Sequence, residues 1–432
     1  MTNTDADRQL IVLTYNLLYG GARAGTLRNW KHRREAVVRA IRHCQPDLLG
    51  VQECLEDQAR FLARQLPGYS WVGRGREADG SGEMTAVFFR ENRFEARASG
   101  HFWLSETPDE PGSRAWDTRC TRIATWIRLQ QRDSGAELLF ANTHLDHGSE
   151  PARLSGARLL LQRLTTLASG APLILTGDFN ARAEASETWS VCMDGGLQDA
   201  WLAAPAVAGP DETWCNFRPP RYGAVARIDW VLFSGELGAC FCESVSYREV
   251  TGFPSDHLPV RAVLQLGQEG GRMAPFVRRE AARALLVTPD DEVLLMCAVN
   301  PSGGQRVWFT PGGGLQPGEK DREGLRRELG EETGRQDLNI GPQVWKRFHA
   351  FPWDSRRLHQ LERFYLVNTP RFKPTMATDL ATSELMSIQE FRWWTADEID
   401  ASTETFAPRR LAELLRTLRR DGPPPRPVDV GL

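Results

Sequence analysis

The chain has 432 residues, of which 41% are hydrophobic and 25% are charged, and its formal net charge is -3. Because a single hydrophobic core rarely grows beyond about 250–300 residues, this length predicts two domains. The small net charge excludes a global field that would attract polyanions, and no apolar run approaches the roughly 20 residues of a membrane span. We therefore expect no membrane segment, and nucleic acid could bind only through a local basic patch.

The first residues, MTNTDADRQLIVLTYN, lack the basic segment followed by an apolar stretch that a secretory signal needs. The eight cysteines are scattered, and the only close pair, Cys240 and Cys242, is too tight for a zinc knuckle or a redox C-x-x-C motif. We expect reduced, mostly buried thiols and a cytoplasmic protein.

From residue 10 to about 264, short β-rich runs alternate with helical patterns, which predicts an α/β domain. Each expected strand is rich in β-branched or large apolar residues; the strands are 10–16, 47–53, 85–90, 123–129, 138–144, 172–178, 228–233 and 257–264. Apolar residues recur at helical spacing from Ala36 to Cys44 and from Leu154 to Leu167. We expect both stripes to face the core.

The segment 267–275 clusters glycine before a proline and has no apolar period, so we interpret it as a linker. The first domain is then 1–266 and the second 276–420. The second domain is expected to contain a hairpin (281–289 and 292–299), a glycine-rich run (312–314) leading into a helix, a strand (361–367) and a basic terminal helix (407–420). The proline-rich tail, 421–432, is expected to be disordered.

An acidic helix follows the glycine-rich run. Glu328, Glu331 and Glu332 stand at i, i+3 and i+4, so three carboxylates point from one helix face. Such crowded like charges are costly without a cation. Mg²⁺ or Mn²⁺, with oxygen ligands, would offset the repulsion and bind the phosphate oxygens of a pyrophosphate. Arg327 can pair with Glu331 one turn on and orient it.

This segment resembles the Nudix hydrolase family. The match to the Nudix box includes every fixed polar and glycine position: Gly313, Glu319, Arg327, Glu328, Glu331, Glu332 and Gly334. The resemblance implies an α/β/α sandwich over about 275–420 that cleaves a nucleoside diphosphate linked to another group. The chain departs from the box at Arg335, a packing position where the family usually has an aliphatic or aromatic residue.

Outside the box the second domain offers only candidates. Glu362 could supply a further acidic residue of the kind many Nudix enzymes have, or it could be a surface glutamate on a strand. Phe351, Trp353, His359 and Trp393 are candidates for base stacking or for packing.

Seven short motifs follow one another in the first domain: TYN ending at Asn16, VQE ending at Glu53, GE at Glu83, NTHLDH around His144, GDFN with Asp178 and Asn180, RID with Asp229, and SDH with Asp256 and His257. In this order they resemble the endonuclease/exonuclease/phosphatase superfamily, which includes deoxyribonuclease I and inositol phosphatases. The resemblance spans residues 8–265. It implies a four-layer α/β/β/α sandwich with two mixed sheets, in which the motifs lie at strand ends and meet in one cleft.

The same resemblance implies roles for these residues. Glu53 would be the principal Mg²⁺ ligand with Asn16 beside it, and Asp178, Asn180 and Asp256 would complete the environment of the metal and the nucleophile. His257, oriented by Asp229, would take a proton from water. His144 would stabilise charge developing on the phosphoryl oxygens, with Glu83 as its hydrogen-bond partner.

Three features beside the motifs leave alternatives open. Arg122 either binds a substrate phosphate or is an ordinary arginine at a strand end. Asp146 and His147 could be local support for the site. The segment 101–122, which carries Trp103 and Trp116 among turn formers, is either a mobile substrate loop or a rigid surface loop pinned by its tryptophans.

We expect a bifunctional, metal-dependent phosphohydrolase acting on nucleotides or other phosphorylated small molecules. The first domain would hydrolyse a phosphodiester or phosphomonoester, and the second a nucleoside diphosphate derivative. The alternative is a nuclease that processes RNA or DNA ends, or a cyclic-phosphate hydrolase, joined to a cap-removing or ligand-sensing Nudix domain. The sequence leaves the oligomeric state open.

Overall fold

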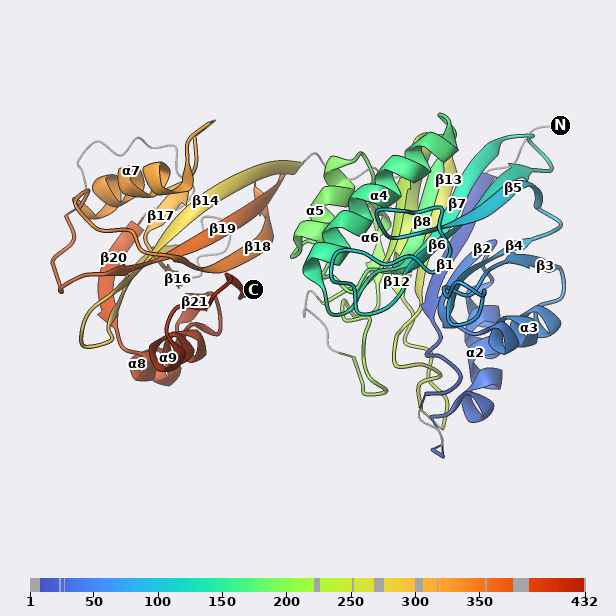
Figure 1. Cartoon of the computed structure of the whole chain (residues 1–432), viewed down its shortest axis with the longest axis horizontal. Helices are drawn as coiled ribbons and strands as arrows, with labels where there is room; N and C mark the ends of the chain where they lie inside the picture. The colour runs from blue at the N-terminus through green and yellow to red at the C-terminus, as the bar shows by residue number, and fades with distance from the viewer. Residues whose placement is uncertain are drawn as a thin grey trace. The chain divides into compact units, whose positions relative to one another are not determined.

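The computed structural model describes residues 8–22, 25–26, 28–220, 226–250, 252–267, 276–299, 306–316, 318–353, 356–375 and 388–430. The chain divides into two compact units, Met1–Ala274 and Pro275–Leu432. This division falls inside the segment predicted as a linker, of which residues 268–275 lie outside the described part. Figure 1 shows the two units, each with its own sheets and helices.

Two mixed sheets form the centre of the first unit. One has the order β10 (Val207–Ala208), β12 (Leu237–Ser244), β13 (Val260–Leu266), β1 (Gln9–Asn16), β2 (Leu48–Cys54), β4 (Met84–Arg90), β3 (Tyr69–Val72). The other has the order β5 (Phe94–Trp103), β6 (Ile123–Gln131), β7 (Glu137–His144), β8 (Leu173–Asp178), β11 (Asp229–Ser234), β9 (Gln198–Asp199). The β1–β2 and β7–β8 pairs are parallel, whereas their outer neighbours β13 and β6 pair antiparallel.

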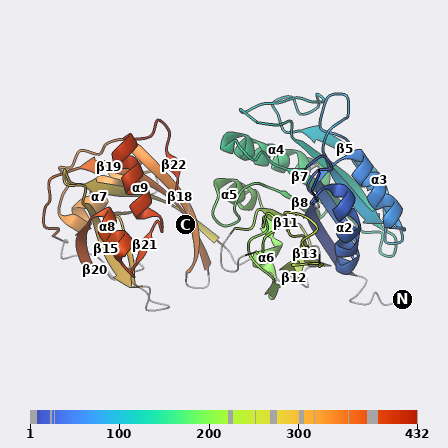
Figure 2. The same ribbon diagram turned by 90° about the horizontal axis from the view of Figure 1, so that it is seen from below.

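Helices cover both outer faces. Helices α2 (Trp30–Cys44) and α3 (Glu56–Gln65) lie on one side of the two sheets, and α4 (Glu150–Ala168) and α5 (Glu187–Asp194) lie on the other (Figure 2). The alternation along β1 explains the layers, because Leu13 and Tyr15 pack against α2 while Leu10 and Val12 pack between the sheets. The four-layer sandwich predicted for this domain is therefore confirmed.

All eight predicted strands of this domain overlap observed strands, and the two apolar stripes lie in α2 and α4. The strands that the sequence pattern missed include β5, which is an edge strand whose middle residues, 96–99, are exposed and are followed by the half-buried Gly100. An edge strand with one partner needs no apolar alternation, so its composition gives little signal.

The space between the two sheets changes from apolar to polar along the strands. On β1, the inward-facing Leu10 and Val12 are followed by the buried Thr14 and Asn16. Asn142 on β7 then joins the sheets, because its Nδ2 donates to the carbonyl oxygens of Val51 (2.8 Å) and Ala86 (3.1 Å) on the opposite sheet. We refer to this polar region, at which the motif-bearing strands end, as the polar seam.

Gly50 allows the sheets to approach closely at the polar seam. A Cβ at this position would lie 2.2 Å from Thr176 Oγ1 and 2.7 Å from Asn142 Oδ1. Asn142 Oδ1 also accepts from Gln52 Nε2 at 2.7 Å and from Thr176 Oγ1 at 3.2 Å. The buried amide therefore uses both its donor and its acceptor atoms, as a buried polar group must.

The second unit is a mixed sheet between helices. Its path is β21 (Thr405–Ala407), β16 (Arg306–Phe309), β15 (Val293–Val299), β14 (Phe276–Val287), β19 (Arg356–Asn368), β18 (Gln343–Trp353), β22 (Val428–Asp429), with β17 (Gly312–Gly314) paired to β14 and β20 (Ile388–Trp394) to β15. Helix α7 (Asp321–Thr333) packs on one face through Leu325 and Leu329, and α8 (Ala396–Ala401) and α9 (Leu411–Asp421) pack on the other (Figure 1). This confirms the predicted α/β/α sandwich.

The prediction of a disordered tail is wrong for the described residues up to 430. Strand β22 pairs in parallel with β18, with Val428 opposite Trp345, and Val430 is buried in the core beneath α9. Proline-rich composition argues against a large apolar core contribution, but a single strand edge and one buried valine suffice to hold a short segment. Among the described helices, none combines the length and the apolar character that crossing a membrane would require.

Candidate active sites

The predicted residues of the first domain meet at a cavity of about 440 Å³ at the end of the polar seam. The side chains that line it are Tyr19, Glu53, Arg76, Glu83, Cys120, Arg122, His144, His147, Asp178, Asn180, Trp214, Ile228, Asp256 and His257. Two further predicted residues, Asn16 and Asp229, are fully buried behind this lining. Residues more than two hundred positions apart are thus brought to one place by strand order.

Two carboxylates converge on one amide. Asn16 Nδ2 donates to Glu53 Oε1 (3.1 Å) and to Asp178 Oδ2 (3.0 Å), so both acidic side chains point to the same spot. Burial and the neighbouring Asp229 carboxylate raise the pKa of Asp178 above its ordinary value. The carboxylates of Glu53, Asp178 and Asp229 are therefore crowded into this corner of the cavity.

Glu53 and Asn180 both have left-handed backbone conformations, with φ of 52° and 47°. Glu53 lies where the register between β2 and β4 shifts, and the backbone N–H of Tyr19 donates to its Oε2 at 3.2 Å. A left-handed conformation is costly for a residue with a long side chain, and such strain is found mostly where function requires it.

His257 is paired with a buried carboxylate, as predicted. Its Nδ1 lies 2.9 Å from Asp229 Oδ2, and its Nε2 lies 3.7 Å from Asp178 Oδ2. Strand pairing sets this geometry, because β11 places Asp229 directly opposite Asp178 on β8. Burial alone would lower the pKa of His257, but the Asp229 and Asp178 carboxylates outweigh it and raise the pKa to about 10.

The hydrogen-bond partner of His144 is not the predicted Glu83 but Asn180. Burial, with the positive charges of Arg122 and His257, lowers the pKa of His144 well below its ordinary value, so the ring is neutral. Its Nε2 lies 3.0 Å from Asn180 Nδ2, which also donates to the Leu145 carbonyl oxygen at 3.0 Å. The amide therefore donates to Nε2, which leaves the proton of the neutral ring on Nδ1.

The predicted hydrogen bond from Glu83 to His144 is not formed. Glu83 Oε2 instead accepts from Arg76 at 2.7 Å, across a turn closed by the Arg76 N–H to Glu83 carbonyl hydrogen bond of 3.1 Å. An arginine within reach is a stronger partner for a carboxylate than a neutral imidazole. Arg76 belongs to none of the predicted motifs, and its only signal in the sequence is its place six residues before Gly82 of the GE motif.

A cationic wall faces the carboxylates. Arg122 is only 5% exposed, donates to His147 Nδ1 at 3.1 Å, and lies 3.8 Å from Asp146 Oδ2. Burial and the like charge of Arg76 lower the pKa of Arg122. We define this pair, the half-buried Arg76 and the buried Arg122, as the cationic wall; two like charges that lower the pKa of one of them favour an anion at this side of the cavity.

The segment 101–122 is held in place at several points. Asp146 Oδ2 accepts from Thr118 Oγ1 (2.8 Å) and from the backbone N–H of Arg119 (2.9 Å). Trp103 is buried and its Nε1 donates to the Arg76 carbonyl oxygen at 2.6 Å. These contacts favour a rigid surface loop over a mobile substrate loop for the segment 101–122.

The acidic residues of the second domain lie on α7 as predicted. Glu328 and Glu332 are buried, whereas Glu331 is partly exposed. Arg327 donates to Glu328 Oε1 (2.8 Å) and to Glu331 Oε2 (3.3 Å), and also makes two hydrogen bonds to Glu319. The expected contact between Arg327 and Glu331 is present, within a larger network that orients the acidic face.

The glycine-rich run fits closely around these carboxylates. The backbone N–H of Gly312 donates to Glu332 Oε2 at 2.7 Å, and a Cβ on Gly313 would lie 2.3 Å from Glu328 Oε2. Gly334 ends α7 with a φ of 74°. Arg335, where the box departs from the family pattern, pairs with Asp337 at 2.6 Å and lies over the Phe372 ring.

Glu362 is neither a surface residue nor an unpaired carboxylate. It is 1% exposed and accepts from Arg283 Nε at 2.8 Å and from Arg347 Nε at 2.6 Å. Trp393 is buried and donates to the Phe372 carbonyl oxygen, which makes it a packing residue. The side chains of Phe351, Trp353 and His359 lie outside the described part of the structure.

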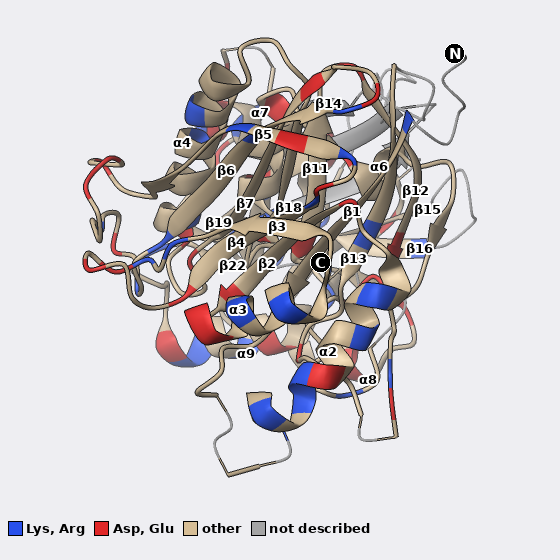
Figure 3. Ribbon diagram, turned by 90° about the vertical axis from the view of Figure 1, so that its right-hand side faces the viewer, with Lys and Arg blue, Asp and Glu red and all other residues tan. Residues whose placement is uncertain are grey.

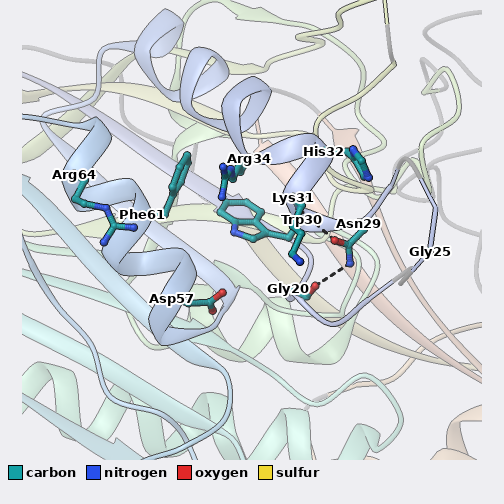
Figure 4. Close-up of a pocket in the computed structure, with 10 residues that line it drawn as sticks. All are labelled: Gly20, Gly25, Asn29, Trp30, Lys31, His32, Arg34, Asp57, Phe61 and Arg64. Carbon is teal, nitrogen blue, oxygen red and sulfur yellow. Dashed lines mark hydrogen bonds between the residues drawn. The ribbon is translucent and has the colours of Figure 1, made fainter.

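A separate hollow of about 550 Å³ lies between α2 and α3 and contains none of the predicted site residues (Figure 4). Trp30 and Phe61 form an edge-to-face pair there, and the Arg34 guanidinium lies 4.7 Å from the Phe61 ring centroid. Lys31 and Arg64 also line it. Figure 3 marks several Lys and Arg positions along α2 in blue. Together with Arg64, Lys31 and Arg34 of this helix give the hollow a local basic patch.

Comparison with known proteins divides the chain in the same way. Residues 13–257 match the model of the Endonuclease/Exonuclease/phosphatase family, and residues 277–417 match the NUDIX domain. A solved structure, a mannosyl-6-phosphatase from Bacteroides thetaiotaomicron, is 32% identical with a TM-score of 0.56, covering 59% of this chain and 99% of that one.

Two curated relatives match one domain each. Nocturnin from Drosophila melanogaster is 28% identical over 166 residues, which are 35% of this chain and 24% of the fly protein. The similarity therefore spans only about a quarter of that relative's length. Nudix hydrolase 25 from Arabidopsis thaliana is 25% identical over 144 residues, which are 31% of this chain and 81% of that protein.

Proposed function

The chain belongs to the endonuclease/exonuclease/phosphatase family and carries a NUDIX domain, and from that premise we propose that it is a bifunctional, metal-dependent phosphohydrolase. The first domain hydrolyses a phosphomonoester of a small molecule. The second hydrolyses a nucleoside diphosphate linked to another group. The two reactions are chemically sequential, since pyrophosphate cleavage releases phosphomonoesters that the first site can use.

The observation that carries the proposal for the first domain is the contact between His257 and Asp229. Asp229 accepts from Nδ1 of His257 at 2.9 Å, so Nε2 is the ring atom that faces the cavity and takes the proton of the attacking water. The cationic wall binds the oxygens of the phosphoryl group. Asn180 keeps His144 in one tautomer beside the reacting phosphorus.

The residues of the first site fit a divalent cation. Glu53 and Asp178 share the Asn16 amide, and Asp178, Asp229 and His257 each offer a ligand atom within 4.8 Å of the others. Because Asp229 is paired with His257, we assign Glu53, Asn16, Asp178 and Asp256 as the residues that would hold the ion. A bound Mg²⁺ or Mn²⁺ would offset the charges of Asp178 and Asp256, which add to that of Asp229 in raising the pKa of His257, and would polarise the phosphoryl oxygens.

The residues of the second site fit a cation for a different reason. Glu328, Glu331 and Glu332 share one helix face, and Gly313 leaves space that a Cβ would fill beside Glu328. These three glutamates would hold Mg²⁺ or Mn²⁺, whose chemistry there is to bind pyrophosphate oxygens. Arg327 orients two of the three carboxylates.

Two observations support a small phosphomonoester. The cavity of about 440 Å³ has the size of a small-molecule site. The similarity to a mannosyl-6-phosphatase extends over 99% of that chain. A second candidate, hydrolysis of nucleic acid ends, is favoured by the basic patch in the hollow beside α2. This patch lies next to the cavity, because Gly20 lines the hollow and the preceding residue, Tyr19, lines the cavity.

The test uses the full chain with Mg²⁺ or Mn²⁺ and a panel of phosphomonoesters, cyclic phosphates, single-stranded RNA and DNA, and nucleoside diphosphate sugars. His257→Ala should lower phosphoester turnover by orders of magnitude and leave pyrophosphate turnover intact. Glu332→Gln should lower pyrophosphate turnover by orders of magnitude and leave phosphoester turnover intact. His43→Ala, a histidine of α2 outside both sites, is the matched control.

The two candidates give different results in this panel. Turnover of nucleic acid that exceeds turnover of every small phosphomonoester and falls steeply with salt would favour the second candidate. Phosphoester turnover that survives His257→Ala would exclude His257 as the general base.

A further inference from the structure

Two exposed aromatic rings stand at the first site. Tyr19 is 40% exposed and Trp214 is 50% exposed, and no other aromatic side chain in the described ranges counts among the exposed large hydrophobic residues. Both rings line the cavity that contains His257 and Asp178. By contrast, Trp189 and Trp230 are fully buried in the same domain. Exposed apolar surface gathered at one site indicates a ligand that covers it.

The backbone of each aromatic residue is hydrogen-bonded to a residue of the proposed active site. The N–H of Tyr19 donates to Glu53 Oε2, and Trp214 forms an antiparallel bridge with His257. The neighbouring Thr213 accepts from the Asp229 N–H through its Oγ1 and from the Leu258 N–H through its carbonyl oxygen. Backbone hydrogen bonds therefore hold the two residues at the site, while both stay exposed to solvent.

Apart from Ile228 and Cys120, the remaining lining is polar. The carboxylates, the histidines and the cationic wall can bind the phosphoryl group, but none of them offers an apolar surface for the group esterified to it. Tyr19 and Trp214 supply that surface. Aromatic faces bind flat rings by stacking and sugar rings through their C–H faces.

We propose that Tyr19 and Trp214 bind a ring, a sugar or a nucleobase, on the alcohol side of the phosphoester, and so select cyclic over acyclic substrates. This inference rests on the proposed phosphomonoesterase activity of the first domain. It adds that the substrate carries a ring within reach of the phosphate.

Steady-state kinetics of the full chain tests the inference with three phosphomonoesters: mannose 6-phosphate, AMP and the acyclic glycerol 2-phosphate. Trp214→Ala and Tyr19→Ala should each lower kcat/KM about ten-fold for a ring substrate and less than about two-fold for glycerol 2-phosphate. Trp214→Phe should restore most of the loss. Val207→Ala removes an equally exposed apolar side chain away from the cavity and should change neither.

Selective loss with AMP alone identifies a base, and loss with mannose 6-phosphate alone identifies a sugar. Equal losses with cyclic and acyclic substrates, or no loss, overturn the inference. Circular dichroism identifies a variant that fails to fold, in which case the other alanine variant, Tyr19→Ala or Trp214→Ala, decides between the outcomes.

Binding separates this inference from the activity on which it rests. Calorimetry on His257→Ala compares the Kd for AMP and mannose 6-phosphate with and without Trp214→Ala. If wild type hydrolyses no phosphomonoester, the proposed activity fails. If neither ring ligand binds, or if removing Trp214 leaves both Kd values unchanged, the ring inference fails.

Discussion

Gly313 shows how a single hydrogen atom in place of a side chain shapes the second site. Since a Cβ would lie 2.3 Å from Glu328 Oε2, Gly313→Ala must push that carboxylate away. We expect pyrophosphate turnover to fall about 10- to 100-fold, as when the support of a metal ligand is removed. Kinetics with a nucleoside diphosphate sugar measures this.

Gly318→Ala is the control for that substitution. Gly318 has a φ of 80° with open space around it, so alanine there strains the backbone by about 1 kcal/mol without touching Glu328. Its activity should stay near that of wild type. Full activity in Gly313→Ala would contradict the steric argument.

Asp146 is the charged residue among the contacts that hold the segment 101–122, and its charge makes the stability of the segment depend on pH. Burial alone would raise the pKa of Asp146. The pKa is nevertheless lowered to about 2 by hydrogen bonds from Gly148, Thr118 and Ser149 and by the charge of Arg122. A lowered carboxyl pKa contributes stability above the unfolded value, near 3.8, which is lost as the pH falls through the folded value.

Asp146→Asn should therefore unfold at a lower temperature than wild type at pH 6, and the difference should shrink as the pH falls from about 4 towards 2. Thermal unfolding followed by circular dichroism at several pH values measures it. A difference that stays constant over this range would show that the Asp146 charge does not hold the segment.

The polar seam depends on Asn142 for hydrogen bonds between the two sheets. Asn142→Ala would leave the Val51 and Ala86 carbonyl oxygens and Gln52 Nε2 without this partner. We expect the free energy of unfolding to fall by about 2–4 kcal/mol, measured by urea denaturation. Thr166→Ala, which removes one exposed hydrogen bond on α4, should cost less than about 0.5 kcal/mol.

Elements with a strong local pattern could be predicted from the sequence, and those fixed by partners could not. The strand 10–16 and the helix around Val37 follow from the spacing of their own apolar residues, which does not depend on the elements that pack against them. Strand β5 forms because β6 offers an edge, and β22 because β18 does. The site shows the same limit: motifs located His257 and Asp229, but the preference of Glu83 for Arg76 depends on a turn that only the folded chain displays.

In the whole molecule, each site is built from residues of its own unit. The cavity lining comes from Tyr19 to His257, and the network of the acidic helix comes from Gly312 to Glu332. We therefore expect an equimolar mixture of His257→Ala and Glu332→Gln chains to release inorganic phosphate from a nucleoside diphosphate sugar, although neither variant alone does so. A mixture that releases none would mean that the intermediate does not pass through solution.

The left-handed backbone at Glu53 has a consequence for protein engineering. Asparagine adopts a φ of 52° more readily than glutamate, and Glu53→Asn would also remove one of two converging negative charges. We expect this substitution to raise the melting temperature and to abolish phosphoester turnover. A directed-evolution campaign scored on thermal tolerance alone would thus enrich inactive enzymes, and heat resistance in such a library would be a marker of lost catalysis.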